Sequence, residues 1–247
     1  MTTFPSNQLS PVTLARIGGL LYLGIIVFGL FSEVGVRTAL AVPNDPAATA
    51  ENILNNALLF RIAFVADLGM LMFDLSLALI FYKLLKPTSP TLAMAALLTR
   101  LAMDATLGLN MMNHFLALMV LDAPTYMSVF SVDQLQAVAL FGLQAHAVGY
   151  SIGLIFFAFH CLVLGYLLYR SDLFPSVFGP LLALAFGSYL IDSAAKFLID
   201  GYSSNDYPLI MIPALIAEVS LCLWLLIKGV RRPDSTTATP LPSSNAT

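Results

Sequence analysis

Six long apolar stretches recur along this chain, and they constrain its fold more than any other feature. Each has about 20 residues or more, the length at which an α-helix crosses the roughly 30 Å hydrocarbon layer of a membrane. They are residues 14–33, 57–82, 91–121, 138–169, 177–199 and 208–229. The pattern predicts an all-α bundle of six transmembrane helices. The third and fourth stretches exceed a perpendicular crossing, so we expect those helices to tilt or to project from the bilayer.

The composition agrees with a protein that lies in a lipid bilayer. Of the 247 residues, 59% are hydrophobic and only 10% are charged, whereas about a quarter of the residues of soluble domains are charged. The net charge of -3 is spread thinly and provides no basic surface for nucleic acid. We predict a cytoplasmic segment at 1–13, one transmembrane domain at 14–230 and a disordered cytoplasmic tail at 231–247.

The basic residues outside the interiors of these stretches predict the orientation in the membrane. Most of them fall on one side: Arg16, Lys83, Lys86, Arg170, Lys228, Arg231 and Arg232. Only Arg37 and Lys196 fall on the other side. The positive-inside rule then places both termini in the cytoplasm, and an even number of crossings agrees with that.

The longest outward connection, residues 34–56, contains an Asp-Pro pair that is typical of a helix start. Asp45 can accept hydrogen bonds from free backbone N–H groups, and Pro46 suits the first helical position because it has no N–H. We therefore expect a short helix in this connection. It serves either as an entry to the second span or as a lid over an outward-facing pocket.

Charged side chains interrupt the apolar stretches, and in lipid they must face the bundle interior, pair with one another or line water. Their spacing gives them common helix faces. Asp67 and Asp74 are seven residues apart in the second span, and Arg100 and Asp104 are four apart in the third. Because buried carboxylates outnumber the basic groups, some must be protonated, hydrated or bound to a cation.

Depth along each helix selects the candidate site residues. At 1.5 Å per residue, one set falls between the middle of the bilayer and its outer third, with its arginine about one turn deeper. These ligand-binding or proton-carrying candidates are Asp67, Arg100, Asp104, His146, Asp192 and Glu218. Asp74 and His160 form a second candidate site near the inner boundary. His114 falls near the outer boundary, so it is the least favoured of these residues.

Two classes of function make chemical use of these residues. In the first, the protein binds or carries a small polar ligand, a proton or a cation; the carboxylates titrate, and Arg100 holds an anionic group or acts as a counter-ion. In the second, it is an intramembrane hydrolase that uses acid/base groups or a divalent metal. The metal ligands would be His146, Asp67, Asp104 and Asp192, which no motif of specific spacing joins.

A third class is a structural or assembly protein whose charges only fix helix packing. The pairs expected in that case are Arg100 with Asp67 or Asp104, and Lys196 with Asp192. The sequence identifies the lipid bilayer as a partner, but it names no cofactor, small ligand or oligomeric state.

Several stretches taken in order resemble a known family of membrane proteins. They are ARIGGLLYL at 15–23, NDPAATAENIL at 44–54, FRIAFVADL at 60–68 and FFAFHCLVLGYLLYRSDLFPSVFGPLLALAFGSYLID at 156–192. Over roughly 14–229 the chain resembles the domain-of-unknown-function family 4386. The resemblance implies a multi-pass protein of the bacterial inner membrane, and it implies no specific activity. The polar members of the matching stretches are Asp45, Arg61, Asp67, His160, Ser171 and Asp192.

Overall fold

The structure, a computed structural model, describes residues 9–122 and 125–231. Residues 232–247 of the predicted tail and residues 1–8 of the predicted first segment lie outside the described residues. Within these described residues, six helices are long and apolar enough to span a membrane, which confirms the predicted all-α architecture. They are α1 (Pro11–Leu30) with its continuation to Leu40, α4 (Ala57–Leu85), α5 (Pro90–Leu121), α6 (Val132–Arg170), α7 (Phe178–Leu198) and α8 (Ile212–Ile227), which a 3-10 turn precedes at Pro208–Met211.

The first helix is longer than its apolar stretch indicates. Beyond α1 the chain continues as a π-helical segment (Phe31–Arg37) and one further turn, α2 (Thr38–Leu40). The predicted outward connection therefore begins later than residue 34. The short helix expected in that connection is present as α3 (Pro46–Asn55).

Three helices begin with a polar side chain followed by proline, a local signal that the sequence carries. Asp45 accepts a hydrogen bond from the backbone N–H of Ala48 at 2.9 Å, directly before Pro46 in α3. Ser10 and Ser89 cap α1 and α5 in the same way, before Pro11 and Pro90. Each cap satisfies a backbone donor that the first turn of a helix leaves free.

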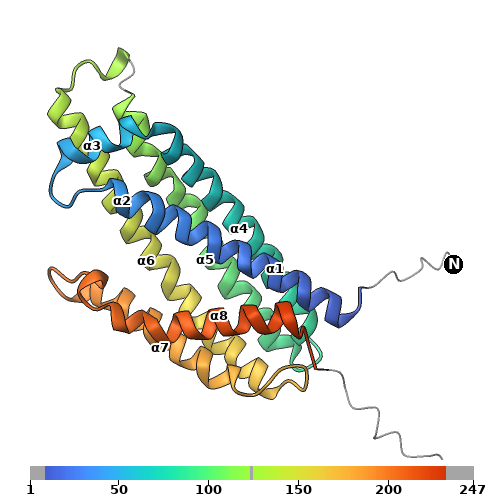
Figure 1. The fold of residues 1–247 in the computed structure, drawn as a ribbon. Helices are drawn as coiled ribbons and strands as arrows, with labels where there is room; N and C mark the ends of the chain where they lie inside the picture. The colour runs from blue at the N-terminus through green and yellow to red at the C-terminus, as the bar shows by residue number, and fades with distance from the viewer. Residues whose placement is uncertain (1–8, 123–124, 232–247) are drawn as a thin grey trace, which may run out of the picture.

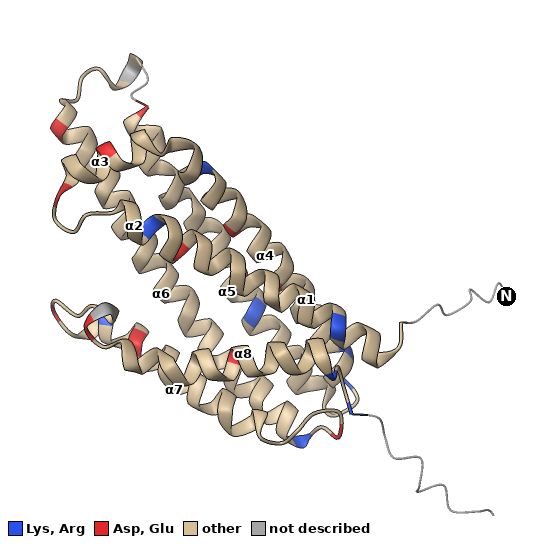
Figure 2. Cartoon of the chain, viewed as in Figure 1, with Lys and Arg blue, Asp and Glu red and all other residues tan. Residues whose placement is uncertain are grey.

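The spanning helices form a ring in which each helix packs on the next (Figure 1). The order is α1, α4, α5, α6, α7, α8 and back to α1. We call the end of the ring that carries α3 the α3 end, and the end where α1 begins and α8 stops the terminal end. Charged residues gather near both ends, and a few lie halfway along the helices (Figure 2).

The contact between α1 and α8 closes the ring at the terminal end. A Cβ atom on Gly19 would lie 2.6 Å from the backbone N of Leu226, so only glycine permits this close approach of two helices. Cys222 and Arg16 also reach backbone carbonyls across the same contact, those of Gly19 and Ile227. Towards the α3 end α8 diverges from the first helix, and this divergence creates the cavity described below (Figure 1).

Candidate functional site

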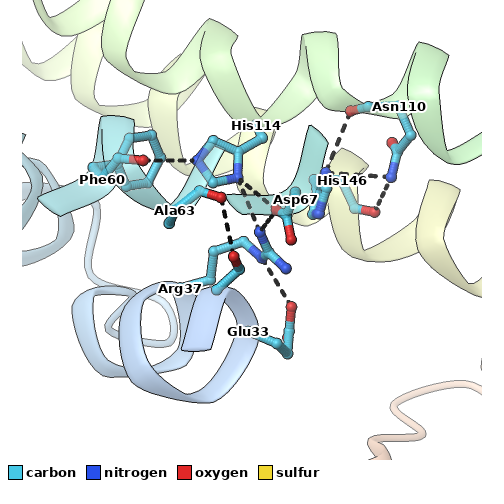
Figure 3. Close-up of polar contacts among 9 residues, drawn as sticks. Glu33, Arg37, Phe60, Ala63, Asp67, Asn110, His114 and His146 are labelled. Atoms are coloured by element: carbon cyan, nitrogen blue, oxygen red, sulfur yellow. Dashed lines mark hydrogen bonds and ion pairs between the residues drawn. The ribbon is translucent and has the colours of Figure 1, made fainter. Parts of the chain in front are cut away.

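One buried polar cluster forms where the π-helical segment meets α4 and α5 (Figure 3). Nε of Arg37 donates a hydrogen bond to Oε2 of Glu33 at 2.8 Å. Nη1 of Arg37 donates to Oδ2 of Asp67 and lies 3.1 Å from Nδ1 of His114. We call these four residues the Arg37 cluster. Three of its members are buried, whereas the Glu33 side chain is 53% exposed.

The π-helical segment itself positions the basic member of this cluster. Ser32 donates a hydrogen bond to the carbonyl of Ala63 at 3.0 Å, which fixes the segment against α4 (Figure 3). The buried side chain of Val36 packs among apolar residues near α3. Arg37 is therefore turned into the bundle instead of towards water. Short π-helical segments within α-helices frequently occur at functional sites.

The hydrogen bonds of His114 identify it as a neutral imidazole. A guanidinium group only donates, so Nδ1 of His114 accepts from Arg37. Nε2 then carries the hydrogen and donates to the carbonyl of Phe60, 3.4 Å away. The Phe60 ring packs on the imidazole with its centroid at 4.3 Å. A fully buried histidine between an arginine and a phenylalanine thus joins α5 to α4.

His146 lies beside the Arg37 cluster and has one free ring nitrogen. Its Nδ1 lies 3.3 Å from the carbonyl oxygen of Asn110, and Nδ2 of Asn110 donates to the His146 carbonyl at 2.8 Å (Figure 3). Gly149 makes room for this contact, because a Cβ atom there would overlap the Asn110 side chain. Nε2 of His146 is buried and has no hydrogen-bond partner among the described residues.

A second buried cluster lies between α4, α5 and α6. Arg100 binds Asp74 with two nitrogens, Nε and Nη2, which donate to the two carboxylate oxygens. Its Nη1 lies 3.1 Å from Nε2 of His160. The Phe157 ring lies 4.9 Å from the guanidinium carbon, at a distance typical of a cation–π contact. We call Asp74, Arg100 and His160 the Arg100 cluster; all three are buried.

The carboxyl group of Asp104 lies next to this cluster, close enough to Asp74 for a hydrogen bond between the two carboxyl groups when one of them carries a proton. Both of its oxygens are buried, and neither meets a hydrogen-bond donor among the residues that the structure describes. It interacts electrostatically with Asp74 and Arg100. Because Arg100 is bound to Asp74 through two nitrogens, Asp104 is left as a carboxyl group without a cation of its own.

Glu218 of α8 approaches the Arg100 cluster from the other side of the ring. Its carboxylate accepts a hydrogen bond from the hydroxyl group of Tyr189 in α7. It also interacts electrostatically with Arg100 and Asp74. Glu218 therefore adds a third carboxylate to the surroundings of a single guanidinium group.

Two cavities lie where α8 diverges from the first helix. The larger has a volume of about 390 Å³ and is lined by the π-helical segment, α8 and the 3-10 turn before α8. Tyr150 of α6 and Tyr189 of α7 also line it. The smaller, of about 190 Å³, is lined by Arg37, His146 and Lys196, among others. Glu33 and Tyr150 line both. Glu218 reaches the larger cavity, so the two cavities connect the edges of the two clusters.

Asp192 lies away from both clusters, near the end of α7. It pairs with Lys196 one turn later, with 3.4 Å between Oδ2 and Nζ, as the spacing predicts. The hydroxyl group of Tyr202, after the end of α7, donates to Oδ1 of Asp192 at 2.9 Å. Partial burial, this hydrogen bond and the charge of Asp192 raise the pKa of Tyr202 to about 12. These contacts of Asp192 hold the segment between α7 and α8 against the end of α7.

The structure divides the residues that depth placed together. Asp67 and His146 lie in or beside the Arg37 cluster, Asp104 and Glu218 lie beside the Arg100 cluster, and Asp192 belongs to neither. The four carboxylates therefore do not meet at one point.

The pairing expected for Arg100 is wrong, because its partner is Asp74 and not Asp67 or Asp104. Asp74 and His160, set apart as a second site, are joined by that arginine.

Two residues of the Arg37 cluster were missed by depth and by hydropathy. His114 seemed too close to the outer surface, yet it is fully buried against Arg37. Arg37 was placed in an outward loop because the apolar stretch stops before it, yet it lies in the continued helix. The signal that could have identified Arg37 is its spacing from Glu33, four residues away on the same helix face.

The candidate metal ligands are likewise separated. Within residues 9–122 and 125–231, no group of three or more His, Cys, Asp or Glu side chains is arranged to hold a metal ion. His146 and Asp67 lie near one cluster, and Asp104 and Asp192 lie elsewhere.

Comparisons with known proteins agree with the resemblance seen in the sequence. The chain matches the model of the family described as domain of unknown function (DUF4386) over residues 17–229. An uncharacterised protein of Archaeoglobus fulgidus is 30% identical to it over 172 residues, which are 66% of this chain and 98% of that protein. No solved structure matched the chain. The family model covers nearly all of the spanning helices, and the chain belongs to the family of domain-of-unknown-function 4386 proteins.

Proposed function

We propose that this protein binds a small polar ligand within the membrane and that a buried carboxyl group next to the Arg100 cluster carries a proton. The observation that carries the proposal is Asp104, whose two buried oxygens meet no hydrogen-bond donor in the described part of the chain. An ionised carboxylate in such a position is costly unless a cation compensates it. The guanidinium of Arg100 is engaged by Asp74, so a proton is the simplest compensation.

The position of Asp104 supports a functional role more than a packing role. A pair that only fixes packing has matched partners, as Arg100 and Asp74 have. Among the described residues Asp104 has neither a donor nor a cation of its own, although a buried asparagine or leucine at this position would avoid the cost. Ionisable groups that remain in membrane helices at such a cost commonly belong to proton or ion pathways.

The cavities provide the place for a ligand. Pockets that bind small molecules have volumes of about 300–1,000 Å³ and mostly apolar walls with a few polar groups. The larger cavity, of about 390 Å³, fits this description, with Glu33, Glu218, Tyr150 and Tyr189 as its polar groups. The electrostatic interactions of Glu218 with Arg100 and Asp74 connect the cavity to the surroundings of Asp104.

We place the transmembrane domain, residues 14–230, in the cytoplasmic (inner) membrane of a bacterium, with both termini in the cytoplasm. The support is the gathering of Lys83, Lys86 and Arg170 near the terminal end. Membrane-impermeant thiol reagents test this orientation. In whole cells they should label a cysteine that replaces Glu51 in α3, and they should not label one that replaces Lys86.

Infrared difference spectroscopy tests the proton on Asp104 directly. The full-length protein in lipid should show the carbonyl stretch of a protonated carboxyl group, and Asp104→Asn should remove it. Asp172→Asn, a change in the exposed turn after α6, is the matched control and should leave the band unchanged. If Asp104→Asn keeps every carboxyl band of the wild type while its helix content is normal, the proton does not reside there and the proposal is wrong.

A further inference from the structure

We propose that the ligand of the larger cavity is an organic cation, an ammonium group attached to a hydrophobic body. This inference rests on the proposed function and specifies its ligand. The cavity has two carboxylates on opposite walls, Glu33 in the π-helical segment and Glu218 in α8. None of the residues that line it is a lysine or an arginine.

Each carboxylate of the cavity has a shared or an uncharged partner. Arg37 donates to Glu33, but the same guanidinium also compensates Asp67, which is almost completely buried. On the opposite wall, Glu218 accepts a hydrogen bond from an uncharged hydroxyl group, that of Tyr189. Arg100, a cation with which Glu218 interacts electrostatically, is bound to Asp74. The walls therefore favour a positive ligand.

The remaining walls suit the body of such a ligand. Apolar side chains line most of the cavity: Ile25, Ile26, Leu30, Met70, Met211 and Leu215. Tyr150 and Tyr189 add aromatic rings beside the carboxylates. Aromatic rings attract quaternary ammonium groups, and more strongly where water is excluded. A hydrophobic ammonium would thus find both kinds of partner within one cavity.

His146 is a second, independent indication of a ligand. It is 3% exposed, it lines the smaller cavity that shares Glu33 and Tyr150 with the larger one, and its Nε2 has no partner among the described residues. Nδ1 lies 3.3 Å from both the carbonyl oxygen and Nδ2 of Asn110, so it is Nε2 that remains for a ligand. A buried ring nitrogen without a partner indicates that a ligand reaches the smaller cavity as well.

The same walls disfavour an anion. Among the described residues, Arg37 and Lys196 are the lysine and arginine side chains on the smaller cavity, and Lys196 already pairs with Asp192. Arg37 in turn is occupied by Glu33 and Asp67. An anionic ligand would have to displace one of these carboxylates, whereas a cation needs no such exchange.

Isothermal titration calorimetry with benzyltrimethylammonium tests the proposal. The full-length protein in lipid nanodiscs is titrated, and the heat from empty nanodiscs is subtracted. We expect saturable binding that the isosteric neutral compound neopentylbenzene and the anion benzenesulfonate do not displace. Glu218→Gln should weaken binding by about ten- to hundredfold, because it removes a charged partner from a partly desolvated site.

Matched variants separate this result from a folding defect. Glu218→Gln keeps an oxygen that can accept from Tyr189, and Glu218→Asp keeps the charge and should bind within a few-fold of the wild type. Glu33→Gln should also weaken binding, whereas Glu51→Gln on the exposed face of α3 should not. The proposal is overturned if the cation does not bind, or if Glu33→Gln and Glu218→Gln both bind it as the wild type does.

The two proposals can fail separately. If benzenesulfonate binds in place of the cation while Asp104 keeps its infrared band, the ligand class is wrong and the proposed function stands. If the cation binds but the infrared band does not depend on Asp104, the proton-carrying role is wrong and the ligand class stands.

Discussion

The Arg37 cluster and the Arg100 cluster share three residue types but differ in their access to the cavities. Each contains an arginine, an aspartate of α4 and a buried histidine that joins two helices. Arg100 gives two nitrogens to one carboxylate and lies on a phenylalanine ring. Arg37 divides its nitrogens between a buried carboxylate and the half-exposed Glu33, at the edge of both cavities. Identical residue types thus form an enclosed structural unit in one place and an accessible one in the other.

The histidines differ in a complementary way. Nε2 of His160 accepts from Arg100, so its Nδ1 carries the hydrogen and donates to the Ala96 carbonyl at 2.8 Å. His114 uses the opposite nitrogens for the same two purposes. Each imidazole relays a hydrogen bond from an arginine to a helix backbone, and the tautomer follows from which nitrogen faces the arginine.

The largest expected effect is that of Arg100→Met. It leaves Asp74 buried without its cation, and removing one partner of a buried ion pair costs about 3–5 kcal/mol of unfolding free energy. Unfolding in mixed detergent micelles, followed by circular dichroism, measures this loss. Arg61→Met breaks an exposed pair with Asp122, and it should change stability by less than about 1 kcal/mol.

Arg37→Met should cost less, about 2 kcal/mol, because the cavities give water access to the carboxylate that it leaves behind. The same unfolding assay compares it directly with Arg100→Met. A loss equal to or larger than that of Arg100→Met would show that the Arg37 cluster is as enclosed as the other, and the distinction between them would fail.

Gly149→Ala should disturb only the surroundings of the Arg37 cluster. The added methyl group overlaps Asn110 and forces it away from His146, and overpacking of this kind costs about 1–3 kcal/mol. Gly187→Ala is the control, since nothing lies within 4 Å of the added atom. In a helix interior that exchange should stabilise by up to about 1 kcal/mol. Equal effects of the two substitutions would argue against the Asn110 contact.

The smallest expected effect is a spectroscopic difference between the two histidines, and it involves no change of stability. Nitrogen-15 NMR of protein labelled at histidine should show the hydrogen on Nε2 of His114 and on Nδ1 of His160. His114→Gln and His160→Asn identify the signals. The same tautomer in both residues would contradict the hydrogen bonds that relate the two clusters.

Local features of the sequence predicted much of the fold. Hydropathy locates spanning helices because each crossing must be apolar along its own length, and Asp45 with Pro46 predicted α3 because capping involves adjacent residues only. The pair of Asp192 and Lys196 was predictable for the same reason, since both lie on one helix face. These inferences need no knowledge of neighbouring helices.

The partners across helices were not predictable in this way. Asp67 and Asp74 share one face of α4, and the choice between them as the partner of Arg100 depends on the relative shift of α4 and α5 along their axes. Helices that are apolar on nearly every side give no periodic signal for their rotation. Arg37 was missed because its helix continues beyond its apolar stretch, and His114 was missed because its partner lies in that continuation.

The π-helical segment limits the insertions and deletions that the first helix tolerates. Deleting or inserting one residue between Phe31 and Arg37 rotates everything after it by about 100° relative to α1. Arg37 would then leave the side of the helix that faces Asp67. Substitutions in this segment act on single contacts, whereas a change of length by one residue would dismantle the whole Arg37 cluster and leave the Arg100 cluster in place.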